Sequence, residues 1–219
     1  AMPRALFEKV GTARFISHLD LMRLFQRAFK RAGLPLTHTQ GFNPRPSVSI
    51  ALPLSLGAES HCELLDFDLE SPVAPEDIRD RLNAALIDGI RVREVYDNGA
   101  KIKYLALLQS RLTLEYDGGI PAGAEAAIGQ LFAREALVLE KKNRNGVTQQ
   151  DIIPMIRRLE ITRQSEGELV LSLLHCCQNP SLNPMQLGAA IEKYLPELTP
   201  DYIRVCREEI YTEEENVFR

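Results

Sequence analysis

The chain has 219 residues, of which 45% are hydrophobic and 26% charged, and its mean hydropathy is −0.16. These values are typical of a globular protein with one large or two small domains, and they exclude a disordered or fibrous chain. No apolar run reaches the roughly 18 residues that span a membrane, and no N-terminal segment has the pattern of a signal peptide. We therefore expect a cytoplasmic protein that does not insert into membranes.

The four cysteines are too few for a disulfide scaffold in a chain of this length, and they lack the spacing of a thiolate metal site. Zinc and iron–sulfur sites need several closely spaced thiolates, and no C-x-x-C pair occurs. We expect the adjacent Cys176 and Cys177 to be buried or half-buried thiols, and we expect no metal site and no cofactor. The cysteines are Cys62, Cys176, Cys177 and Cys206.

Charge is distributed unevenly along the chain, although the formal net charge is only −4. Residues 1–47 contain eight Lys and Arg against two acidic residues, so the remainder is strongly acidic. Such asymmetry indicates one face that binds an anionic partner.

The first half of the chain alternates strand-like and helix-like patterns. Residues 4–16 are rich in β-forming side chains. Ser17, followed three residues later by Asp20, has the form of a capping box and begins an amphipathic helix that ends at Gly33. The patterns that follow are strand-like at 47–56 and 61–70, helical at 76–87 and strand-like at 90–96. This order predicts a ferredoxin-like domain over residues 1–98, with both helices on one face of an antiparallel sheet.

The second half repeats this alternation with one strand more. Strand patterns at 111–116, 136–141, 157–163, 168–175 and 202–211 are interspersed with helical patterns at 124–133 and 184–194. Residues 142–146 read as a polar turn, and Pro154 interrupts any pattern over 151–155. We predict an α+β protein of two tandem ferredoxin-like (βαββαβ) units, the second covering residues 99–219 with an insertion.

Several short motifs identify a family resemblance. They are R-F-I-S-H-L-D-L-M-R at 14–23, R-A-G-L-P at 31–35, G-F-N-P-R-P at 41–46, A-L-P-L-S-L-G at 51–57 and N-P-S-L-N-P at 179–184. With these motifs the chain closely resembles the bacterial radical SAM-linked, or radical SAM-associated, proteins, a family of unknown function. Its members are fused to, or encoded beside, a radical SAM enzyme with a cobalamin-type domain. The resemblance therefore implies an accessory protein.

The cysteine spacing agrees with an accessory role, in which a partner enzyme carries the catalytic cluster. Radical SAM chemistry needs a C-x3-C-x2-C run to hold its cluster, and this chain has none. Any radical chemistry would therefore take place on the partner enzyme, while this chain would bind and position the substrate.

Two tandem ferredoxin-like units are also similar to the CRISPR repeat-cleaving endoribonucleases. Those enzymes carry a Gly-rich loop near the C-terminus, whereas residues 211–215 of this chain are acidic and contain no glycine. This difference argues against RNA cleavage, because a shared fold does not by itself imply a shared activity.

The first predicted helix is the first candidate site. Arg23, Arg27 and Arg31 recur at i+4 spacing, with no acidic residue between them, on the face opposite the apolar stripe. Like charges in this arrangement destabilise a helix slightly, so their presence favours phosphate binding. His18, in the first turn, is a weak candidate for a ligand-binding or acid/base residue.

The Gly-Phe-Asn-Pro-Arg-Pro loop at 41–46 is the second candidate. Two prolines and Gly41 would preorder it, and Phe42, Asn43 and Arg45 suit stacking on a base with polar readout. We expect this loop to lie beside His18 and the basic helix. The upstream residues His38 and Gln40 would share the pocket.

The leading hypothesis is a non-catalytic accessory protein that recognises a substrate, with RNA as the expected class, for a radical SAM partner. One alternative is an RNA-processing or acid/base enzyme that uses His18 with Arg23 or Arg45. The other is a module that only docks a protein partner.

Overall fold

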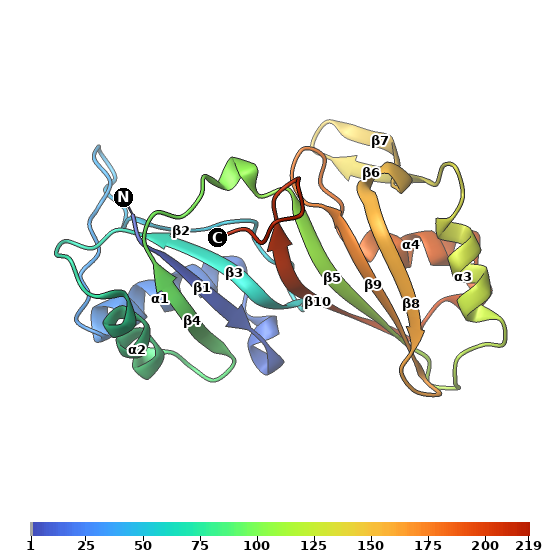
Figure 1. The fold of residues 1–219 in the computed structure, drawn as a ribbon, viewed down its shortest axis with the longest axis horizontal. Helices are drawn as coiled ribbons and strands as arrows, with labels where there is room; N and C mark the ends of the chain where they lie inside the picture. Colours follow the sequence, from blue (N-terminus) through green and yellow to red (C-terminus); the bar gives the residue numbers. More distant parts are fainter. Residues whose placement is uncertain (1) are drawn as a thin grey trace. The chain divides into compact units, whose positions relative to one another are not determined.

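The computed structural model describes residues 2–219, which form two compact units (Figure 1). Unit 1 comprises residues 2–104 together with Arg219, and unit 2 comprises Leu105–Phe218. No helix of residues 2–219 combines the length and the apolar character needed to cross a membrane.

Unit 1 is a ferredoxin-like fold. Its antiparallel sheet has the order β4-β1-β3-β2, and its two main helices follow β1 and β3 in the chain (Figure 1). The elements are β1 (Arg4–Lys9), the short 3-10 helix η1 (Gly11–Phe15), α1 (His18–Arg31), β2 (Val48–Ile50), β3 (Glu59–Phe67), α2 (Pro75–Ala85) and β4 (Ile90–Tyr96).

Helix α1 begins where the sequence predicts. The Ser17 hydroxyl accepts a hydrogen bond from the Asp20 backbone N–H at 3.2 Å, which satisfies one of the free donors of the first turn. Its apolar stripe packs on the sheet through two aromatic pairs, Phe7 with Phe25 at 4.8 Å and Phe29 with Phe67 at 4.9 Å between ring centroids. Because the stripe is buried, the basic residues of α1 are left on the opposite, exposed side.

Arg81 of α2 stabilises the C-terminal end of α1. Its guanidinium donates to the Ala32 carbonyl at 2.7 and 3.0 Å and to the Gly33 carbonyl at 2.9 Å, while Gly33 takes the left-handed conformation at φ +70°. A cation at this end also interacts favourably with the helix dipole.

Arg81→Met is expected to lower the free energy of unfolding of unit 1 by about 1–2 kcal/mol, because the last carbonyls of α1 lose charged donors. Urea unfolding followed by circular dichroism measures the change. Arg79→Met is the matched control, since Arg79 lies on the same helix and pairs only with exposed Asp80. Equal effects of the two substitutions would contradict this role of Arg81.

Unit 2 has the same topology with one added hairpin. Its four main strands form an antiparallel sheet in the order β10-β5-β9-β8, and β6 and β7 form a separate two-stranded sheet (Figure 1). The elements are β5 (Leu107–Glu115), α3 (Ala124–Phe132), β6 (Val138–Asn143), β7 (Gly146–Asp151), β8 (Ile156–Arg163), β9 (Glu168–Cys176), α4 (Met185–Tyr194) and β10 (Tyr202–Tyr211).

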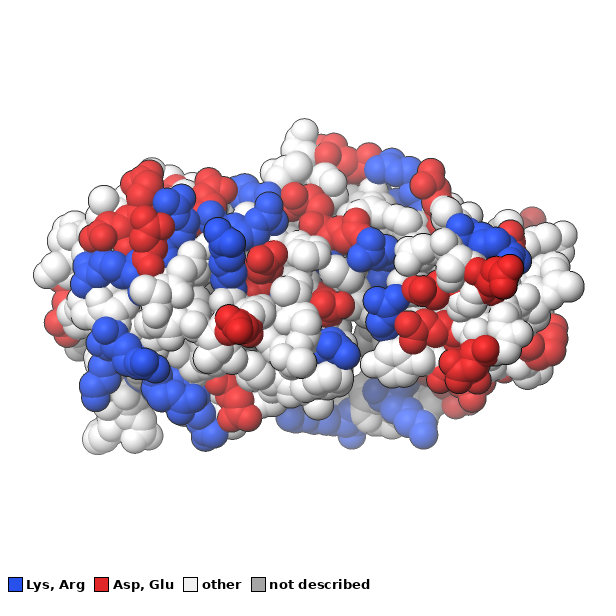
Figure 2. All heavy atoms as spheres, turned by 90° about the horizontal axis from the view of Figure 1, so that it is seen from below, with Lys and Arg blue, Asp and Glu red and all other residues white. Residues whose placement is uncertain are grey.

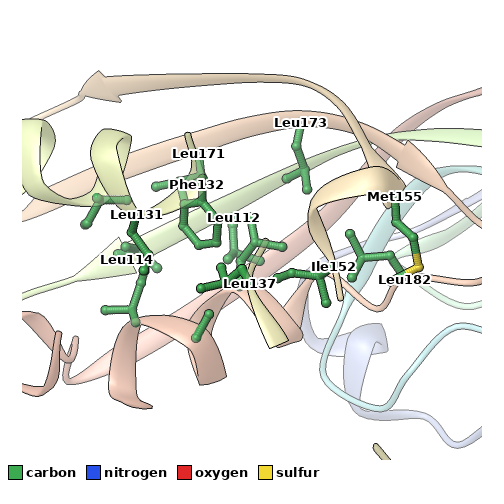
Figure 3. Packing of buried hydrophobic residues seen from close by; sticks show 14 of the residues in the cluster. Leu112, Leu114, Leu131, Phe132, Leu137, Ile152, Met155, Leu171, Leu173 and Leu182 are labelled. Atoms are coloured by element: carbon green, nitrogen blue, oxygen red, sulfur yellow. The ribbon is translucent and has the colours of Figure 1, made fainter. Parts of the chain in front are cut away.

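The core of unit 2 lies between its sheet and its two helices. Leu112 and Leu171 come from adjacent strands and meet Leu131 and Phe132 of α3 (Figure 3). Leu137 and Ile152, which flank the β6–β7 hairpin, are also fully buried in this core. The prediction of an α+β fold with two tandem ferredoxin-like units, helices on one face of each sheet, is confirmed.

Two sequence-based elements differ from the structure. The strand predicted over 47–56 is only Val48–Ile50, because the chain turns at Leu52, which has φ +49°, and Pro53 has no N–H to donate. The polar turn predicted at 142–146 is the tip of a hairpin whose second strand, β7, was not predicted. That strand is almost entirely polar and exposed, so it lacks the alternation that marks a half-buried strand.

Candidate functional site

A groove of about 560 Å³ lies beside α1 in unit 1. It runs along the C-terminal two-thirds of the helix, over the segment that follows it and against the base of the loop at 37–47. The lining residues are Arg23, Gln26, Arg27, Phe29, Lys30, Gly33, Leu34, Pro35, Leu36, His38, Pro46 and Glu70.

The floor of the groove is apolar. Phe29, Leu34 and Leu36 are buried in the unit 1 core yet reach the groove surface, and Pro35 and Pro46 add apolar edges. The turn at Gly33 directs Leu34 back under the helix, where its N–H donates to the Phe29 carbonyl at 2.9 Å. Such a floor offers few polar groups and suits a flat, weakly polar ligand surface.

The rim of the groove is mainly basic. Arg23, Arg27 and Lys30 are exposed along the helix, and Glu70 is the acidic residue in the lining. Figure 2 shows Lys and Arg side chains gathered on the surface of unit 1, at the lower left. A basic rim around an apolar floor can bind a ligand that combines a planar ring with negative charge.

The rim residues differ in their partners. Arg23 lies 3.6 Å from Asp20, which stands three residues earlier on the same face of α1. Within residues 2–219, Arg27 and Lys30 make no ion pair or side-chain hydrogen bond. Arg31 is exposed but does not line the groove.

The loop at 37–47 folds on itself as a hairpin. The Thr39 N–H donates to the Arg45 carbonyl at 2.8 Å, and the Ser47 N–H donates to the Thr37 carbonyl at 2.8 Å. His38 and Pro46 pair at its base and line the groove. The tip residues Gln40, Phe42, Asn43 and Arg45 are exposed and do not line it, with the Phe42 ring fully open to solvent.

His18 does not join this site. We expected the loop to fold back beside His18, but the groove lining starts at Arg23, and the base of the loop lies against the C-terminal half of α1. A 14-residue helix is about 21 Å long, and His18 stands at its other end. The base of the loop is tied to the segment after β3, because the Thr37 N–H donates to the Asp68 carbonyl at 3.0 Å and the Thr37 hydroxyl donates to the Asp68 carboxylate at 2.9 Å.

The family comparison gives a clear result. The family described as "Uncharacterized protein conserved in bacteria (DUF2344)" matches residues 3–184. The chain belongs to this family. No curated protein matches it.

Solved structures show how this DUF2344 member relates to known folds. A chain in a crystal structure of a Cbf5–Nop10–Gar1 complex matches with a TM-score of 0.54 at 7% identity, covering 96% of this chain and 50% of that one. The chain thus spans about half the length of that relative, and at this identity the match shows similarity of fold alone. A second match is the chain in a crystal structure of an unknown protein from Galdieria sulphuraria. Its sequence identity is 12%, the match covers 94% of this chain and 96% of that one, and the TM-score is 0.26.

The buried polar groups of unit 2 were not singled out by the sequence. His175 is fully buried, with its Nε2 2.8 Å from the Ser110 hydroxyl and its Nδ1 3.0 Å from the Cys176 carbonyl. Because a carbonyl only accepts, Nδ1 carries the proton and Nε2 accepts from Ser110. The four cysteines are buried, as predicted for Cys176 and Cys177, and burial raises the pKa of Cys177 to about 12. Among residues 2–219, no three or more His, Cys, Asp or Glu side chains are grouped so that they could hold a metal ion.

Proposed function

We propose that this protein is a non-catalytic accessory protein that recognises RNA through the α1 groove and presents it to a radical SAM enzyme. The observation that supports this proposal is the groove itself, in which Arg27 and Lys30 stand without partners beside an apolar floor. RNA supplies both matching surfaces, since its phosphates are anionic and its unstacked bases are flat and weakly polar.

The geometry favours a single-stranded segment as the bound form. A groove on the surface of one domain can accept a base only when that base is unstacked, as in loops, bulges and ends. Phe42 at the tip of the neighbouring loop is an exposed aromatic ring on which a further base can stack. Asn43, also exposed at this tip, supplies donors and acceptors for a base edge.

The radical SAM partner is supported by the sequence. The motifs at 14–23 and 41–46 are those shared with the radical SAM-linked proteins, and α1 and the adjoining loop are built from them. The cluster-binding C-x3-C-x2-C run is missing from this chain. In this proposal the partner carries out the chemistry, and this chain supplies affinity and orientation.

Arg27→Ala is expected to weaken binding of a labelled single-stranded RNA several-fold and to lower the slope of log K against log salt by about 0.7, the value for one lost phosphate contact. Fluorescence anisotropy of the full chain over a salt series measures both quantities. Arg79→Ala removes one exposed helical arginine outside the groove and should leave affinity and slope unchanged.

Two results of the binding experiment would overturn this proposal. One is a wild-type chain that binds no RNA at low salt. The other is equal behaviour of the Arg27 and Arg79 variants, which would indicate general charge attraction without a groove. If the chain binds only the enzyme partner, the docking-module alternative holds. Cleavage of the RNA by the chain alone would favour the enzyme alternative.

A further inference from the structure

The β6–β7 hairpin of unit 2 is an insertion that the fold does not need. It lies between α3 and β8, and its two strands pair only with each other, apart from the four-stranded sheet (Figure 1). Its base is anchored, since the Leu137 N–H donates to the Asp151 carboxylate at 2.8 Å and the Tyr194 hydroxyl donates to the Val138 carbonyl at 2.8 Å. Beyond Leu139 nearly every residue is exposed, so the tip extends from a fixed base into solvent.

The tip of this hairpin is basic within an acidic unit. Unit 2 has 11 Lys and Arg against 17 Asp and Glu, so acidic groups are available to pair with its cations. Five arginines on the strands of unit 2 form ion pairs with glutamates at 3.4 Å or less. They are Arg111, Arg157, Arg158, Arg163 and Arg204.

The tip cations differ from these arginines in having no partner. Lys141, Lys142 and Arg144 are exposed, and within residues 2–219 their side chains make no ion pair and no hydrogen bond. Glu140 is the only acidic residue between Val138 and Gln150, and it lies on the base side of all three cations. The positive charge at the tip is therefore not neutralised locally.

The turn forms without these cations. The Asn143 side chain accepts from the Asn145 N–H at 2.9 Å, and Gly146 takes a φ of +123°, which a glycine adopts without strain. Successive strand residues point to opposite faces, so Lys141 and Lys142 place charge on both sides of the ribbon. Clustering like charges at a tip has a small cost in stability, and nothing in the hairpin requires it.

We propose that the tip of the β6–β7 hairpin is a second RNA contact, which binds the phosphodiester backbone independently of the α1 groove. The assignment of RNA as the ligand of this tip rests on the function proposed above for unit 1. Lysine, arginine and asparagine are side chains that contact phosphate and sugar oxygens. Val147 is the only apolar side chain near the tip, which is too little to enter a membrane or to form the apolar centre of a protein interface.

The test compares two triple variants of the full chain with a labelled single-stranded RNA. The hairpin variant carries Lys141→Gln, Lys142→Gln and Arg144→Gln, and it should bind about tenfold more weakly at low salt, with a log–log salt slope lower by about 2. The control variant carries Arg157→Gln, Arg158→Gln and Arg163→Gln, which removes the same charge from the same unit at paired positions. It should bind as the wild type does, and circular dichroism verifies that both variants are folded.

The outcomes separate this inference from the proposed function. If the Arg27 variant loses affinity while the hairpin variant binds like the control, the hairpin contact is wrong and the groove stands. If the wild-type chain binds no RNA, both proposals fail. If the hairpin variant keeps its RNA affinity but no longer binds polyglutamate or phosphatidylserine vesicles, the tip serves an acidic protein or a membrane and the inference is overturned.

Discussion

Replacing Arg4 by methionine is expected to lower the free energy of unfolding of unit 1 by about 3 kcal/mol, because the substitution leaves a charge without its partner. The Arg4 guanidinium is buried and holds Asp66 through two hydrogen bonds, at 2.6 Å from Nε and 3.1 Å from Nη2. A third bond, from Nη1 to the Ala100 carbonyl at 2.8 Å, ties the segment after β4 to β1. Loss of these bonds leaves the half-buried Asp66 carboxylate without its cation.

Hydrogen exchange followed by mass spectrometry measures this loss in the full chain, since protection of β1 and β3 amides reports on unit 1 alone. Arg23→Met is the control, because it lies in unit 1 and its pair with Asp20 is solvent-exposed at 3.6 Å and should contribute less than about 1 kcal/mol. The double variant Arg4→Met with Asp66→Leu should recover part of the lost stability. A loss no greater than that of the Arg23 variant would show that the buried pair does not stabilise unit 1.

The parts of the fold that the sequence predicts well are those with one buried face. Helix α1 has an apolar residue every three or four positions and a capping serine, and strands β4 and β10 have the bounds predicted for them. Burial of one face imposes a period on the sequence, which can be read without the structure. Strand β7 has no buried face, and its formation depends on pairing with β6, so no period marks it.

The candidate site also has one part that a sequence period reveals and one part that it does not. The basic face of α1 is visible in the sequence because it is the complement of the apolar stripe. The groove floor is not visible, because Leu34 and Leu36 come from the connection after the helix and form a surface only when that connection packs beneath α1. The position of the loop was predicted wrongly, since the bonds between Thr37 at its base and Asp68 after β3 join distant segments and are not apparent from residue types alone.

Lowering the pH from about 6.5 to about 4 is expected to reduce the stability of unit 2 by about 3 kcal/mol through His175 alone. Burial lowers the pKa of His175 from its ordinary value of 6.5 to about 4, and the positive charge of Arg207 acts in the same direction. The unfolded chain therefore binds a proton in this pH range that the folded chain does not. The stabilising contribution is complete above pH 6.5 and is lost as the pH falls toward 4.

Urea unfolding followed by circular dichroism over this pH range measures the effect, which should amount to about 1.4 kcal/mol per pH unit. In His175→Gln the amide can still donate to the Cys176 carbonyl and accept from Ser110, but it does not titrate. The pH dependence in this range should therefore be smaller by the His175 contribution, whereas His18→Gln, at an exposed position, should retain it. If the His175 variant loses stability with falling pH as steeply as the wild type, the acid sensitivity of unit 2 arises elsewhere. The Ser110–His175 pair would then contribute hydrogen bonding alone.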